Sequence, residues 1–246
     1  MSDKGEKRAE LTEHLAELRA RLVRSFVYLV VGAILGWVFY DFVFDVMKRP
    51  MMPVVEELDT KFLFTTMAGP FFLRMQISLI SGVIAALPLI TYELWSFVSP
   101  GLTASEKKPL RWIVPLSILL FIAGVALGYI ILPMTFGWFS QFLPANSELR
   151  PDPQKNVFWS LKFVLAFGLM FELPVVLMLL AKLGIINSSM LKENWRVAVV
   201  GVAVLSAVVT PSGDAMTMLV MCIPVVCLYF LSIGLVRMVE AKPSKQ

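Results

Sequence analysis

The sequence predicts an all-α, polytopic membrane protein with six transmembrane helices and with both the N and C termini in the cytoplasm. Three observations lead to this prediction. Of the 246 residues, 58% are hydrophobic and 16% are charged, whereas a soluble domain is about 25% charged. The apolar residues fall in long blocks, and the mean hydropathy is +0.77. Lysine and arginine are unevenly distributed between the blocks. This composition excludes a disordered chain and argues against a soluble globular domain.

Six apolar stretches are predicted to cross the bilayer, because about 20 apolar residues in a helix are needed to span a hydrocarbon core of about 30 Å. Their approximate ranges are 22–44, 71–98, 112–132, 157–181, 197–209 and 215–236. The first is too long for the apolar region of a signal peptide and is followed by no cleavage site, so we expect it to be retained. The second contains Pro88 and is long enough to tilt, to kink or to project past the bilayer.

The later stretches carry further signals. The third contains Gly124 and Gly128, whose spacing of four favours close helix contact. The fourth contains an acid near its middle. The fifth has only 13 residues and falls short of a full span by itself. The sixth is long enough, and its two cysteines, Cys222 and Cys227, lie on different faces of the predicted helix. We therefore expect buried, unpaired cysteines and neither a disulfide nor a metal site.

The distribution of lysine and arginine predicts the orientation. With the N-terminus inside, the inside segments hold 15 of these residues and the outside loops hold 5. Inside loops of membrane proteins are enriched in positive charge, so both termini are predicted to be cytoplasmic. This count does not distinguish two full spans from a re-entrant hairpin over 196–237, because that segment begins and ends inside in either case. No internal repeat or soluble domain is evident, and residues 1–246 are expected to form a single integral membrane domain.

The segment 11–22 has the pattern of an amphipathic helix. Its leucines recur at helical spacing on one face, at positions 11, 15, 18 and 22. We interpret it as an interfacial helix on the inner leaflet, with a Glu17–Arg21 pair four residues apart. His14 is the only histidine in the chain, and a solvated surface position is expected for it.

The loop over 99–111 combines a tight turn with a helix start. Pro100-Gly101 is a turn signal, and Thr103 followed by Glu106 fits a capping box at the start of the third spanning helix. The capping role accounts for Glu106 structurally. The alternative is a carboxylate on the cytoplasmic face that is available to a cationic ligand.

Glu172 is an acid within the fourth predicted span. A charged carboxylate at that depth costs roughly 2.5–3.5 kcal/mol, so it must be neutral, paired or turned toward a wet cavity. Lys162 is about 15 Å away along the same helix and cannot pair with it directly. An intramembrane acid of this kind is a functional candidate. Farther along, Pro211 is expected to end the fifth helix and Asp214 to cap the sixth.

Enzyme signatures are absent from the sequence. It contains no GxxxxGK[ST] loop, no GxSxG turn and no HExxH motif. With one histidine, outside the spans, a serine–histidine site or a multi-histidine metal site in the membrane is excluded. We expect no catalytic residue, no metal, no cofactor and no nucleic-acid partner.

Several segments together resemble the TatC family of twin-arginine protein translocases, over about residues 11–237. The first is His14-Leu15-Ala16-Glu17-Leu18-Arg19-Ala20-Arg21-Leu22 before the first span. The others, in order, are Pro70-Phe71-Phe72; Tyr92, Trp95 and Phe97; Pro100-Gly101-Leu102-Thr103 with Glu106; Phe167-Gly168 and Phe171-Glu172-Leu173-Pro174; and Thr210-Pro211 with Asp214. Motifs in this order, on the right sides of six spans, are specific to the family, whose short fifth and sixth helices also suit the 13-residue fifth span.

The resemblance implies a receptor that binds the twin-arginine signal peptides of folded proteins at the cytoplasmic face. Together with single-span TatA/TatB-type subunits, it would support their transport driven by the proton-motive force. The implied signal-peptide residues are Glu17, Arg19, Pro100, Gly101, Leu102 and Glu106. Carboxylates suit this task because a guanidinium can donate two parallel hydrogen bonds to one of them, whereas lysine offers a point charge.

The resemblance also implies roles outside the peptide site. Glu172 would contact the single-span partners within the membrane. The residues implied to lie on the periplasmic side are Pro50, Phe71, Pro211 and Asp214. A multi-copy receptor complex, in contact with membrane lipid, is implied as well. We expect the bacterial cell inner (cytoplasmic) membrane in preference to the thylakoid membrane.

Two other classes of function are alternatives to this one. The first is a secondary transporter that uses Glu172 as a proton or cation relay. Such transporters usually contain repeats and broken helices at matching positions, and none is found in the sequence. The second is an intramembrane enzyme, which the missing nucleophile–base pairs disfavour.

Overall fold

The computed structural model describes residues 3–98, 104–144, 147–210 and 213–239, with side chains described for 15–97, 113–144, 147–210 and 213–238. The described part consists of helices and connecting loops, without a strand. Its elements are α1 (Asp3–Val38), α2 (Tyr40–Lys48), the short 3₁₀ helix η1 (Arg49–Met51), α3 (Met52–Glu57), α4 (Gly69–Val98), α5 (Ala104–Ser140), α6 (Pro153–Phe171), α7 (Leu173–Lys182), α8 (Ser188–Glu193), α9 (Trp195–Val209) and α10 (Ala215–Val239).

The six predicted apolar elements are confirmed. Five helical segments are long and apolar enough to cross a membrane: Leu15–Val38, Gly69–Phe97, Ile113–Ser140, Pro153–Lys182 and Ala215–Met238. The sixth element is α9, whose 15 residues rise only about 22 Å. The protein is therefore a multi-pass membrane protein with one short apolar helix.

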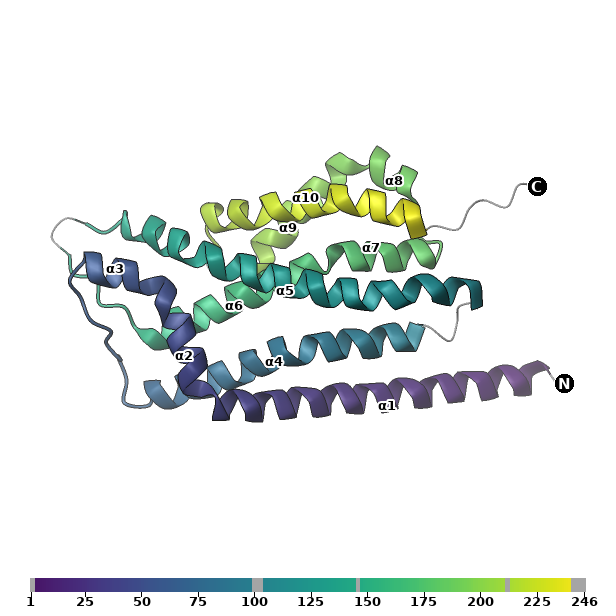
Figure 1. Ribbon diagram of the computed structural model, residues 1–246, viewed down its shortest axis with the longest axis horizontal. Coiled ribbons are helices and arrows are strands. Elements are labelled where there is room, and N and C mark those ends of the chain that lie inside the picture. The colour runs from purple at the N-terminus through teal and green to yellow at the C-terminus, as the bar shows by residue number, and fades with distance from the viewer. Residues whose placement is uncertain (1–2, 99–103, 145–146, 211–212, 240–246) are drawn as a thin grey trace.

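The long helices lie side by side along one axis (Figure 1). We call the end of the bundle where α1 begins the amino-terminal end. The last turns of α4, the start of α5, helix α8 and the last turns of α10 lie toward this end. The short elements α2 and α3 and the loops after α3 and α5 form the opposite end. Consecutive long helices thus run in alternating directions.

Helix α1 differs from the prediction in two ways. It runs without interruption over 36 residues, so the segment 11–22, which we interpreted as an interfacial helix, is continuous with the first span; the chain has no proline before position 50 to break it. The first span also ends at Val38 and not at Phe44. Phe39 leaves helical geometry, with φ −91° and ψ 18°, and α2 turns away at an angle (Figure 1). This turn brings Met47 of α2 into a buried cluster with Leu73 of α4.

Small residues allow the helices to approach closely. A Cβ atom at Gly32 of α1 would lie 2.6 Å from the carbonyl oxygen of Gly82 in α4. The predicted contact at Gly124 and Gly128 of α5 is confirmed, because Cβ atoms there would lie 2.7 and 2.9 Å from atoms of Phe167 in α6. Close packing of this kind holds membrane helices together, since lipid removes the hydrophobic drive between them.

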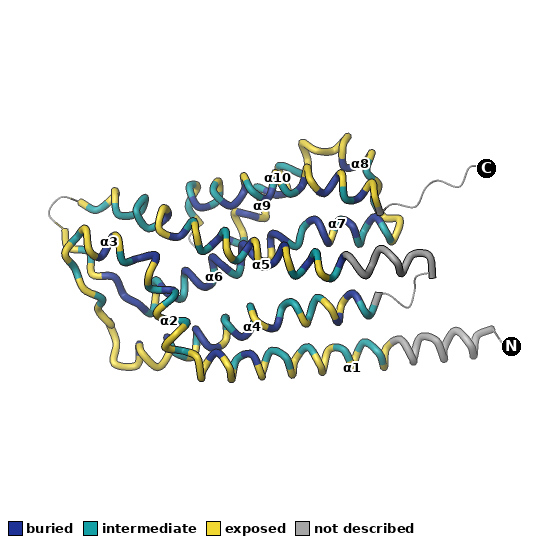
Figure 2. Tube along the Cα trace, in the orientation of Figure 1, coloured by how far each residue is buried: buried dark blue, intermediate teal, exposed yellow. Residues whose placement is uncertain are grey.

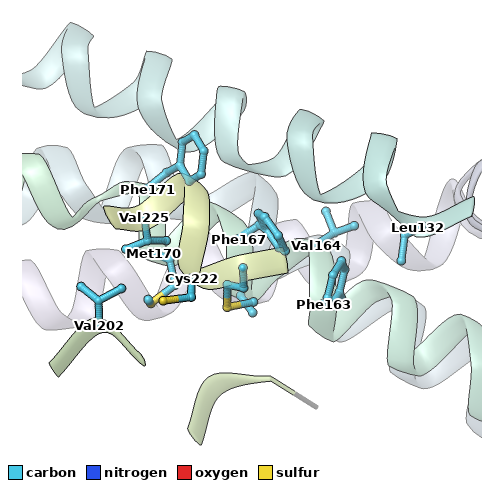
Figure 3. Packing of buried hydrophobic residues seen from close by; sticks show 11 residues of the cluster. Leu132, Phe163, Val164, Phe167, Met170, Phe171, Val202, Cys222 and Val225 are labelled. Carbon is cyan, nitrogen blue, oxygen red and sulfur yellow. The ribbon is translucent and has the colours of Figure 1, made fainter. Parts of the chain in front are cut away.

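Burial is uneven across the bundle (Figure 2). Only 11% of the apolar window of α1 is buried, against 56% of the window in α6 and α7. The largest part of the core joins α6 to α9 and α10, and Phe163, Phe167, Met170, Val202 and Cys222 belong to it (Figure 3). Cys222 and Cys227 are both free, as predicted, but Cys227 is exposed and not buried. It is on the face of α10 turned away from this core.

Candidate functional site

A buried carboxylate joins α1 to α4 near the amino-terminal end of the bundle. Glu93, near the end of α4, is 2% exposed. Arg21 donates from Nη1 to Glu93 Oε2 at 3.0 Å and from Nη2 to the carbonyl oxygen of Ser96 at 3.0 Å. Arg24 Nη1 and the Tyr28 hydroxyl donate to Glu93 Oε1 at 3.2 and 3.3 Å. Burial of a carboxylate is costly unless it is paired, and these donors satisfy both oxygens.

The helical repeat explains why three residues of α1 converge on one acid. Arg21, Arg24 and Tyr28 are spaced by three and four, and such positions share one face of a helix. That face lies against α4, where Gly32 and Gly82 bring the two backbones together. We did not single out Glu93 from the sequence. The available signal was the same as for Glu172, an acid inside a predicted span, over 71–98.

Glu17 shares the same guanidinium. Nε and Nη2 of Arg21 both donate to Glu17 Oε1, with Nε at 3.1 Å, which confirms the predicted pair four residues apart. The Glu17 side chain is 31% exposed, whereas that of Glu93 is 3% exposed. Arg21 therefore bridges a surface carboxylate and a buried one.

The structure separates Arg19 from this cluster. Arg19 is exposed and lines a different surface hollow, together with Leu15 and Val23 on another face of α1. Two positions along a helix rotate the side chain by about 200°, which turns Arg19 away from α4.

The remaining predicted peptide residues belong to the junction of α4 and α5. Pro100, Gly101 and Leu102 lie outside the described residues, as does Thr103 of the predicted capping box. Glu106 lies in the first turn of α5, and its side chain is outside the described part. The start of α5 and the start of α1 lie toward the same end of the bundle (Figure 1).

Glu172 lies at the break between α6 and α7, inside the predicted fourth span. Pro174 contributes to this break because it has no N–H for the helical bond to Met170. Ser117 of α5 is fully buried, and its Oγ lies 2.8 and 2.7 Å from the two carboxylate oxygens of Glu172. Its single hydroxyl hydrogen donates to either oxygen. The Glu172 side chain is half-buried. Ser117 was not among the predicted site residues, although a hydroxyl in an apolar span is a signal for a helix–helix hydrogen bond.

The opposite end of the bundle holds the other predicted residues. Asp214 caps α10, as expected, by accepting the backbone N–H of Thr217 at 2.8 Å. Phe71 is 59% exposed and stands edge-on to Trp37, and Pro50 is buried in η1. Pro211 lies outside the described residues.

A further buried acid at this end has a structural role. Asp152 caps α6 through the N–H of Gln154 at 3.0 Å and accepts the Thr65 hydroxyl at 2.7 Å. It thereby ties the loop after α3 to the start of α6. Among the described residues, no group of three or more His, Cys, Asp and Glu side chains is arranged to hold a metal ion.

Comparison with known proteins gives one consistent result. The sequence model of a family described as "Sec-independent protein translocase protein (TatC)" matches residues 13–224. A protein of that name from Desulforapulum autotrophicum is 38% identical over 229 residues, covering 93% of this chain and 84% of its own. One from Xylanimonas cellulosilytica is 37% identical over 230 residues, covering 93% and 83%.

Solved structures agree with the sequence matches. A crystal structure described as twin arginine translocase receptor TatC in DDM superimposes with a TM-score of 0.78 at 32% identity, covering 90% of this chain and 98% of that one. A second crystal structure of the same receptor gives a TM-score of 0.77 at 32% identity and covers 92% and 99%. The similarity thus extends over nearly the full length of both.

Proposed function

Because the chain belongs to the TatC family of Sec-independent protein translocase proteins, it is a receptor subunit of the twin-arginine translocase, and we propose that Glu17 and Glu106 bind the arginine pair of the signal peptide. The observation that carries this proposal is the contact of Glu17 with Arg21. The Glu17 carboxylate already accepts two donors of one guanidinium and remains partly exposed. A peptide arginine can use the same oxygens.

The chemistry accounts for selectivity without a catalytic residue. A guanidinium is a planar fork of donors that matches a carboxylate, whereas an ammonium is a compact point charge. Two carboxylates on one surface therefore favour an arginine pair over a lysine pair. In this proposal the Pro100-Gly101-Leu102 segment contributes to the same surface, whereas Arg19 contacts the peptide from another face of α1. This segment follows Ser96, whose carbonyl oxygen accepts a hydrogen bond from Arg21, by only a few residues in the sequence.

We propose further that both termini are cytoplasmic and that the protein resides in the bacterial inner membrane. The excess of lysine and arginine in the segments assigned to the inside supports this orientation. It puts Glu17 and Glu106 on the cytoplasmic face and Pro50, Phe71, Pro211 and Asp214 on the periplasmic side. The secondary-transporter alternative has no support, since the relatives are named as protein translocases.

Glu172 is proposed as the contact for single-span TatA/TatB-type subunits in a multi-copy receptor complex. It is a half-buried carboxylate in an apolar span, and Ser117 gives it one hydroxyl donor. Its remaining lone pairs can accept a hydrogen bond from a polar side chain of a partner helix. Facing lipid alone, a charged acid would cost several kcal/mol.

Binding of a labelled twin-arginine signal peptide to the purified protein in lipid nanodiscs tests the site. Glu17→Gln should lower the affinity about tenfold, because a charge-assisted hydrogen bond is lost. Glu106→Gln should do the same while keeping its capacity to cap α5. Glu193→Gln, a change at an exposed carboxylate of α8, is the control and should bind normally. A lysine-pair peptide should bind weakly throughout.

The capping alternative for Glu106 predicts a different pattern. If Glu106→Gln bound the peptide normally and Glu106→Ala only destabilised the protein, Glu106 would be a helix cap and not a peptide ligand. Normal binding by Glu17→Gln as well would refute the proposed site.

A further inference from the structure

We propose that Arg21 competes with the signal peptide for Glu17, and that Glu93 holds the Arg21 guanidinium when a peptide arginine displaces it. This inference rests on the proposed binding of the signal peptide at Glu17. It assigns Arg21 and Glu93 as positioning residues that set the affinity of the receptor.

The geometry divides the donors of Arg21 between two sets of acceptors. Nε is directed to Glu17, at 3.1 Å from Oε1. Nη1 is directed to α4, at 3.0 Å from Glu93 Oε2, and Nη2 also reaches the Ser96 carbonyl oxygen at 3.0 Å. Loss of the Glu17 contacts would therefore leave the guanidinium bound to α4 through Nη1 and Nη2. Arg21 can release Glu17 without leaving its place.

Burial decides which of the two carboxylates a peptide can reach. The Glu17 side chain is 31% exposed, whereas the Glu93 side chain is 3% exposed and lies between α1 and α4. A peptide arginine approaching from solvent meets Glu17 first. Glu93 forms ion pairs with Arg21 and Arg24, and the low local dielectric strengthens both pairs.

Charge explains why the displaced arginine needs Glu93. Glu17, Arg21, Arg24 and Glu93 contribute two negative and two positive charges. A peptide arginine adds a third cation close to Arg21 and Arg24. Without Glu93 these side chains would repel the incoming guanidinium, and Arg21 would have only Glu17 as a carboxylate partner.

Competition of this kind lowers the affinity for every cationic peptide by the same factor. The apparent dissociation constant is the intrinsic constant divided by the fraction of receptors in which Glu17 is released. A partly exposed ion pair changes such a population about fivefold. The ratio of twin-arginine to twin-lysine affinity stays constant, because displacing Arg21 costs the same for both. The dissociation constant of the twin-lysine peptide, which is already the larger of the two, therefore rises further above the concentration at which the peptide is present.

Two variants should change affinity in opposite directions. Arg21→Gln removes the two guanidinium donors that compete for Glu17 Oε1, while Glu93 keeps Arg24 and Tyr28 as donors, so twin-arginine peptide should bind about fivefold more tightly. Glu93→Gln leaves Arg21 with Glu17 as its carboxylate, so the same peptide should bind about fivefold more weakly. The double variant Arg21→Gln/Glu93→Gln should follow Arg21→Gln.

The measurement is fluorescence anisotropy of a labelled signal peptide with the full-length protein in lipid nanodiscs, with thermal unfolding to show that each variant is folded. Arg196→Gln, an arginine change away from the cluster, is the control and should bind within twofold of the wild type. The twin-lysine peptide is measured in parallel, and its affinity should shift by the same factor as that of the twin-arginine peptide. If Glu93→Gln does not fold, Arg21→Gln alone decides the matter.

The outcomes separate this inference from the proposed site. Weaker or unchanged binding by Arg21→Gln, with binding still dependent on Glu17, would overturn the competition and would mean that Arg21 orients Glu17 for the peptide. Normal binding by Glu17→Gln would refute the proposed site and this inference with it. Tighter binding by Arg21→Gln together with loss by Glu17→Gln supports both.

Discussion

Replacing Gly82 with valine tests whether close packing of α1 on α4 positions Arg21 against Glu93. A Cβ at position 82 would lie 2.4 Å from the Ala33 nitrogen and 2.7 Å from the Ala33 Cα and the Gly32 carbonyl carbon. Non-bonded carbon atoms prefer about 3.5–4.0 Å. All the atoms it would meet belong to the backbone and cannot rotate away. The two helices would therefore have to separate by about 1 Å or more.

The expected cost lies at the upper end of the range for overpacking. Inserting a side chain into a well-packed contact typically costs 1–3 kcal/mol, and we expect about 3 kcal/mol from Gly82→Val. Glu93 follows Gly82 by about 16 Å along α4, so the same separation should weaken its contact with Arg21. Peptide binding should fall together with stability.

Unfolding by sodium dodecyl sulfate in mixed micelles, followed by tryptophan fluorescence, measures the first effect, and peptide anisotropy measures the second. Gly201→Val in α9 is the matched control, because a Cβ at that position meets nothing within 4 Å. It should change the free energy of unfolding by less than about 0.5 kcal/mol. A Gly82→Val protein as stable as the Gly201→Val protein would refute the reasoning.

Three further predictions concern the membrane interior and the opposite end. Ser117→Ala should lower the free energy of unfolding by about 1.5 kcal/mol, since Glu172 loses its hydroxyl donor. The control is Ser232→Ala, which removes a hydroxyl that is hydrogen-bonded within its own helix. Equal effects of the two substitutions would contradict the prediction. Glu172→Ala should leave insertion and peptide binding intact but impair transport in membrane vesicles, and a photocrosslinker at position 172 should capture a single-span partner helix; crosslinks to lipid alone with undiminished transport would exclude this role. A cysteine at Asp214 should react with a membrane-impermeant maleimide only from the outside, and should lower stability by about 1 kcal/mol through loss of the α10 cap. Labelling only from the inside would mean that α9 and α10 re-enter.

Local properties of the chain were predictable from the sequence. Five of the six apolar elements follow from block length, because the bilayer sets the number of residues that a span requires; the fifth, with only 13 residues, follows from its apolar composition. Asp214 as a cap and Gly124 with Gly128 as a close contact depend on short-range spacing, and both are found. The Glu17–Arg21 pair was predictable for the same reason, since four residues make one turn of a helix.

Contacts between distant parts of the chain were decided only by the tertiary structure. The sequence places Glu93 and Ser117 within spans, but which arginines or acids they meet depends on the approach and rotation of neighbouring helices. Arg21 reaches Glu93 only because Gly32 and Gly82 let α1 lie against α4.

The direction that the chain takes after the first span was also decided by the tertiary structure and not by the local sequence. Hydropathy predicted an apolar stretch to Phe44. The chain nevertheless turns at Phe39, where the sequence contains no proline or glycine that would predict a helix end. The turn is stabilised by Met47 packing against Leu73, 26 residues later. By itself, the sequence determined which segments enter the membrane, because transfer from water to lipid is additive along the chain. Packing decided how the helices meet, because van der Waals contact depends on the shapes of two surfaces at once. Packing therefore also decided which carboxylates accept hydrogen bonds from Arg21.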